Sequence, residues 1–135
     1  MPPLRLLAVN HQSVDLLLLE ALLSEVLPTA EFTSCPSAAQ ALEYLSRVDP
    51  LPHLVLVNLH MVGLSSLDLI RQLGLDPRLR ALPVIIMSGS VDPEDCTRAL
   101  AAGAADYLVK PLNSAEQEKQ LLHLAQTWRH LYDVP

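Results

Sequence analysis

The chain has 135 residues, of which 50% are hydrophobic but only 4% are aromatic, and its formal net charge is −6. This length fits a single domain, residues 1–135, with an aliphatic core. The negative charge argues against direct nucleic-acid binding, which needs clustered Lys and Arg, and no apolar run approaches the roughly 18 residues of a membrane span.

Short apolar runs alternate with longer segments of helical character along the whole chain. Strands are expected at about 4–9, 31–35, 53–59, 83–88 and 105–110, and helices at about 13–27, 37–48, 65–73, 93–102 and 114–132. Ser13, Ser37 and the pattern Ser114-x-x-Gln117 are expected to cap helix starts. Pro93 fits the first turn of its helix, and Gly103 fits the left-handed position that often follows a helix.

Five strands that alternate with five helices predict repeated βαβ units and a parallel sheet with helices on both faces. In such folds the functional site lies beyond the carboxyl ends of the strands. The residues to inspect there are Asn10, His11, Asn58, His60, Ser88 and Lys110.

Three stretches resemble the receiver domain of bacterial two-component response regulators. They are LLAVNHQSV, HLVLVNLHMVG followed by LDLIRQL, and VIIMSGS leading to AAGAADYLVKPL. The resemblance implies an α/β flavodoxin-like (βα)5 fold with strand order 2-1-3-4-5. It also implies that Lys110 contacts phosphate, that Ser88 and Tyr107 are the switch residues, and that the Lys110–Pro111 bond is cis.

The chain departs from this family where the family does its chemistry. The acidic pair that holds Mg²⁺ aligns with Asn10 and His11, and the phospho-acceptor Asp aligns with Asn58. An amide cannot form an acyl phosphate, and neutral side chains beside Lys110 are poor ligands for Mg²⁺. We therefore expect a degenerate phosphorylation site without negative charge, with no enzymatic activity, no metal and no other cofactor.

Several alternatives stay open at this stage. His11 and His60 should project into one pocket, where they would bind a metal such as Zn²⁺ or respond to pH. The chain could also be a conventional phosphorelay receiver with another acceptor residue, or a flavodoxin-like module for a small ligand.

The leading hypothesis is a pseudo-receiver that signals by binding proteins, without phosphorylation. The resemblance implies that residues 93–102, 105–110 and 114–132 form the face for a homodimer, a sensor kinase or an output protein. Tyr107 and Trp128 are the expected interaction residues on it. The run Leu16–Leu19 covers every side of a helix, so at least one of its side chains must point outward. Two isolated cysteines and the absence of an export segment favour a cytoplasmic location.

Overall fold

The computed structural model describes residues 3–60, 63 and 65–128. Five parallel strands form one sheet in the order β2-β1-β3-β4-β5. They are β1 (Arg5–Val9), β2 (Glu31–Cys35), β3 (Leu54–Asn58), β4 (Val84–Ser88) and β5 (Asp106–Val109). The predicted strand order is therefore confirmed.

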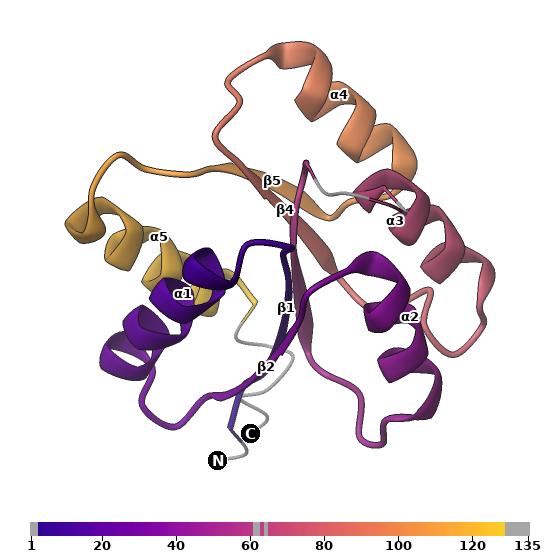
Figure 1. Ribbon diagram of the computed structural model, residues 1–135, viewed down its shortest axis with the longest axis horizontal. Helices are drawn as coiled ribbons and strands as arrows, with labels where there is room; N and C mark the ends of the chain where they lie inside the picture. The colour runs from indigo at the N-terminus through magenta and orange to yellow at the C-terminus, as the bar shows by residue number, and fades with distance from the viewer. Residues whose placement is uncertain (1–2, 61–62, 64, 129–135) are drawn as a thin grey trace.

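Helices cover both faces of this sheet (Figure 1). They are α1 (Ser13–Val26), α2 (Ala38–Arg47), α3 (Ser66–Leu75), α4 (Pro93–Ala102) and α5 (Ser114–Thr127). Helices α1 and α5 lie together on one face, and α2, α3 and α4 lie on the other. Within the described residues, none of these helices has the length and apolar character needed to cross a membrane.

The core consists of two hydrophobic clusters, one on each face of the sheet. Alternate residues of β3 divide between them, with Leu54 and Leu56 facing α1 and α5, and Val55 and Val57 facing the other helices. All four side chains are at most 2% exposed, and each stabilises the fold by about 1.5–3 kcal/mol. Burial on both faces explains why this strand is a continuous apolar run rather than an alternating one.

Local signals placed some helix ends correctly. The Ser37 hydroxyl accepts a hydrogen bond from the Gln40 N–H at 3.1 Å, and Gly103 adopts a left-handed φ of 115° after α4.

Two predicted caps are wrong. Helix α1 is preceded by Gln12 and has no side-chain cap, and Asn113 rather than Ser114 caps α5. The Asn113 side chain lies one residue earlier and accepts from the Glu116 N–H at 2.9 Å, which leaves Ser114 inside the helix.

Two further expectations concern the region around α5. The expectation of a cis peptide bond at Lys110–Pro111 is wrong. That bond is trans, and among the described residues the cis bond lies at Asp49–Pro50. Trans remains the preferred form of most X–Pro bonds. Helix α5 ends at Thr127, with Trp128 as its C-cap, and the rest of the range expected up to residue 132 lies outside the described residues.

Candidate functional site

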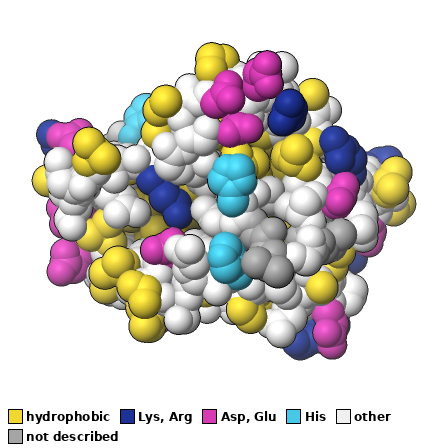
Figure 2. Space-filling view, turned by 45° about the horizontal axis from the view of Figure 1, so that its top comes forward, with side chains coloured by type: hydrophobic (Ala, Val, Ile, Leu, Met, Phe, Trp, Pro, Cys, Tyr) yellow, Lys and Arg dark blue, Asp and Glu magenta, His cyan; other side chains and the backbone are white. Residues whose placement is uncertain are grey.

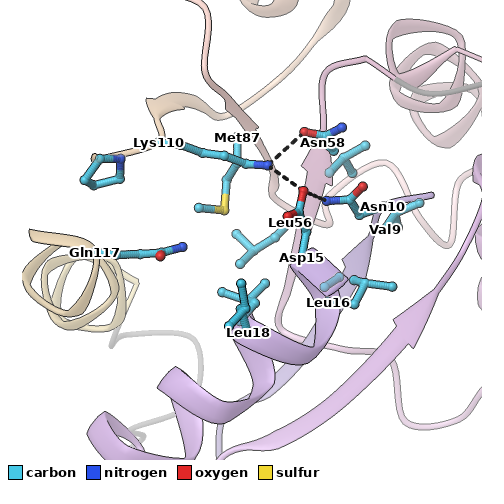
Figure 3. Close-up of a pocket in the computed structure, with 14 residues that line it drawn as sticks. Val9, Asn10, Asp15, Leu16, Leu18, Leu56, Asn58, Met87, Lys110 and Gln117 are labelled. Carbon is cyan, nitrogen blue, oxygen red and sulfur yellow. Dashed lines mark hydrogen bonds and ion pairs between the residues drawn. The ribbon is translucent and has the colours of Figure 1, made fainter. Parts of the chain in front are cut away.

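The carboxyl ends of β1, β3 and β5 bring three of the predicted site residues together. Asn10 directly follows β1 and is 7% exposed, Asn58 ends β3, and Lys110 follows β5. The Lys110 ammonium donates a hydrogen bond to Asn58 Oδ1 at 3.2 Å (Figure 3). Parallel strands thus assemble a site from positions up to 100 residues apart in the sequence.

Asp15, which the sequence analysis did not select, completes this site. Its Oδ2 lies 3.6 Å from Lys110 Nζ and accepts a hydrogen bond from Asn10 Nδ2 at 3.4 Å. The prediction of a site without negative charge is therefore wrong. Asp15 lies in the first turn of α1, where acidic residues are common because they compensate the helix dipole, so the position alone did not indicate a site. We refer to Asn10, Asp15, Asn58 and Lys110 as the polar cluster.

Each of the two amides in the polar cluster donates one hydrogen bond through its nitrogen and accepts another through its oxygen. Asn10 Oδ1 accepts from the Gln12 N–H at 3.0 Å while its Nδ2 donates to Asp15. Asn58 Nδ2 donates to the His60 carbonyl at 2.7 Å while its Oδ1 accepts from Lys110. An ionised carboxylate has no proton to donate, so an aspartate at either position would lose one of these two bonds. The surroundings of Asn10 and Asn58 therefore suit an amide side chain better than a carboxylate.

A small cavity lies beside the polar cluster, between the sheet and helices α1 and α5. Its volume is about 140 Å³, and its apolar wall is formed by Leu16, Leu18, Leu19, Leu56 and Met87. That volume corresponds to roughly five water molecules and is well below the ~300–1,000 Å³ of typical small-molecule sites. The cavity therefore gives little support to a flavodoxin-like ligand site.

The two histidines do not enter this cavity. His11 and His60 are both exposed, and neither is among the residues that line it. The expectation that both project into this pocket is wrong, because each follows its strand at a point where the chain has already reached the surface. In the described part of the chain, no three His, Cys, Asp or Glu side chains are grouped as metal ligands would be.

The polar cluster also fits Mg²⁺ poorly. Mg²⁺ in proteins usually needs one or two carboxylates and close octahedral geometry. Here the Asp15 carboxylate and the Asn58 oxygen both face the ammonium of Lys110, and the Asn10 oxygen accepts a backbone N–H. A divalent cation would have to displace Lys110 from these oxygens and would lie close to its positive charge.

The sequence matches the response regulator receiver domain family over residues 6–122. This chain is a receiver domain. It is 32% identical to the two-component response regulator ARR16 of Arabidopsis thaliana, over 90% of this chain and 80% of that protein. A response regulator in red light signalling of R. palustris superposes with a TM-score of 0.88 and 28% identity, over 100% of this chain and 99% of that one. The phosphorylated cyanobacterial phytochrome response regulator RcpA has a TM-score of 0.84 at 18% identity, with 93% and 94% coverage, and shares the fold.

The expected switch residues of this receiver meet at one backbone segment. Ser88 is 1% exposed, and its hydroxyl accepts from the Ser90 N–H at 3.0 Å. The Tyr107 hydroxyl donates to the Ser90 carbonyl, also at 3.0 Å. Ser90 in turn donates its own hydroxyl proton to Asp95 at 2.6 Å. Ser90, which the sequence analysis did not single out, thus links β4, β5 and α4.

The expected interaction residues are less exposed than the sequence suggested. Trp128 is half-buried and packs against the core cluster of α1 and α5, while Tyr107 packs against the opposite cluster. The exposed large apolar side chains on α4, β5, α5 and the loop between β5 and α5 are other residues, namely Leu100, Val109, Leu112 and Leu122. The outward-facing members of the leucine run on α1 are Leu17 and Leu18.

Proposed function

We propose that this receiver domain signals in the cytoplasm by phosphorylation-independent protein–protein interaction. The observation that carries the proposal is Asn58 at the expected acceptor position, with its amide hydrogen-bonded to the His60 carbonyl and to Lys110. The amide nitrogen is delocalised and is not a nucleophile for phosphoryl transfer, and the surrounding oxygens fit Mg²⁺ poorly. Both features support a site that does not form an acyl phosphate.

The direct test is incubation with acetyl phosphate and Mg²⁺, followed by intact-mass measurement. We expect no change in mass, whereas a receiver with an acceptor Asp, treated in parallel, should gain one phosphoryl group. A gain of one phosphoryl group on this chain would favour the alternative of a conventional phosphorelay receiver with another acceptor, and peptide mapping would locate that residue.

We further propose that residues 1–135 act as one domain without enzymatic activity, metal or other cofactor. Receiver domains of response regulators are in general non-enzymatic signalling modules. Direct nucleic-acid binding is not expected either. Figure 2 shows Lys and Arg side chains interspersed with Asp and Glu on the face that it draws, and the net charge is −6.

The proposed interaction face is formed by α4, β5 and α5. Leu112 is fully exposed, and Leu100, Leu122 and Val109 are 48%, 41% and 39% exposed. Apolar side chains exposed on neighbouring elements are typical of an interaction surface. Receiver domains interact with kinases or output partners, so a sensor kinase, an output protein or a second copy of this chain is the proposed occupant.

A matched pair of variants tests this face. Leu112→Asp places a charge at its most exposed apolar side chain, in the loop between β5 and α5, and Leu75→Asp makes the same change at an 84% exposed position at the end of α3. We expect Leu112→Asp to weaken self-association in light scattering, or capture of a partner, while Leu75→Asp behaves as the unchanged protein. Equal effects of the two variants would count against the α4–β5–α5 face.

A further inference from the structure

The site contains an ion pair between Asp15 and Lys110, two residues that come from elements far apart in the sequence. Asp15 comes from the first turn of α1, and Lys110 follows β5. Their side chains are 36% and 30% exposed, and the carboxylate oxygen lies 3.6 Å from the ammonium (Figure 3). We propose that this ion pair fills the site with the chain's own charges, so that the carboxylate takes the place of an external anion and the ammonium takes the place of a divalent cation. The proposal concerns the binding of free ions and does not depend on the proposed signalling function.

The ammonium occupies the position that a cation would need. Lys110 Nζ lies 3.2 Å from Asn58 Oδ1 and 3.6 Å from Asp15 Oδ2, so both oxygens are directed at one positive charge. The remaining amide oxygen, that of Asn10, is neutral and already accepts the Gln12 N–H, so it is a weak ligand for a metal ion. A divalent cation could enter only after Lys110 leaves these oxygens.

The Asp15 carboxylate occupies the position that an anion would need beside Lys110. A phosphate that approaches Lys110 meets the negative charge of Asp15 on the same ammonium. Each amide nitrogen already donates one of its two N–H groups inside the protein, since Asn10 Nδ2 donates to Asp15 and Asn58 Nδ2 donates to the His60 carbonyl. An anion at Lys110 would therefore compete with these internal contacts and face a neighbouring carboxylate.

Removal of either charge should expose the other to an ion of opposite sign. Asp15→Asn should allow inorganic phosphate to bind at Lys110, and Lys110→Met should allow Mg²⁺ to bind at Asp15. In each case we expect a gain in affinity of up to roughly fivefold over the unchanged protein, which is the factor that corresponds to the upper range of a part-exposed ion pair. The double variant Asp15→Asn/Lys110→Met should show neither gain.

The measurement is a titration of the ¹⁵N-labelled full chain with inorganic phosphate or MgCl₂ at constant ionic strength, followed by amide chemical shifts. The control is Glu116→Gln, which frees Lys119 from an ion pair of 3.4 Å on the surface of α5. This variant should not gain phosphate binding, because Lys119 is 73% exposed and lies in an open groove where water screens its charge. The proposal is overturned if the unchanged protein binds either ion as tightly as the single variants, or if the double variant or Glu116→Gln shows the same gain.

Discussion

Replacing Asn58 by aspartate tests whether the polar cluster is adapted to an amide. The substitution keeps the size of the side chain and changes only its charge and its hydrogen-bonding capacity. It converts the donor that meets the His60 carbonyl into an acceptor, and it places a second carboxylate beside Lys110. We expect the Asn58→Asp variant to be less stable than the unchanged protein by about 1 kcal/mol at neutral pH.

Three terms give this magnitude. Loss of the 2.7 Å hydrogen bond from Asn58 Nδ2 to the His60 carbonyl costs about 1 kcal/mol. The new ion pair with Lys110 returns up to about 1 kcal/mol at a part-exposed position. The carboxylates at positions 15 and 58 would contact the same ammonium, so they lie within about 7 Å and repel by roughly 2 kcal/mol at an effective dielectric of about 20, a value that salt at about 0.15 M approximately halves.

The assay is equilibrium unfolding in urea of four proteins: the unchanged chain, Asn58→Asp, Asp15→Asn and the double variant. The repulsion term requires Asp15, so the Asn58→Asp change should have little effect on the free energy of unfolding in the Asp15→Asn background. A stabilisation by Asn58→Asp, or a cost that stays the same without Asp15, would refute the electrostatic reasoning.

Three further outcomes are expected. Millimolar Mg²⁺ should leave the melting temperature of the unchanged protein as it is, because a ligand stabilises only at concentrations near or above its Kd, and a rise of several degrees would show a metal site. The pKa of His53 is lowered by burial and by the charge of Arg5, and its Nδ1 accepts the Arg5 backbone N–H at 2.8 Å, so the stability that it contributes is present above about pH 6.5 and is lost as the pH falls through its folded pKa. Urea unfolding should therefore show a flatter dependence on acid pH for His53→Gln, and equal slopes would contradict the assignment. Gly103→Ala should cost about 1–2 kcal/mol in the same assay, since φ is +115° and the new Cβ would lie 3.3 Å from Ile70, whereas an unchanged stability would show that the backbone relaxes freely there.

Much of the fold followed from local pattern. The continuous apolar run of β3 predicted a strand that is buried on both faces, and the alternation of strands with helices predicted a parallel sheet with helices on both sides. Parallel topology alone then predicted that Asn10, Asn58 and Lys110 would meet, because the carboxyl ends of parallel strands share one edge. The caps of α1 and α5 were missed, since a shift of one residue changes which side chain precedes the helix.

The sequence by itself determined that Asn58, Asn10 and His11 stand where the resemblance leads us to expect the acceptor and the acidic pair. Only the tertiary structure decided that the site nevertheless holds a carboxylate, and that His11 and His60 stay outside the cavity. The physical reason is that pattern and propensity report the neighbours of a residue along the chain. The contact of Asp15 with Lys110 depends instead on where the first turn of α1 lies over the edge of the sheet, which is set by the packing of α1 beside α5.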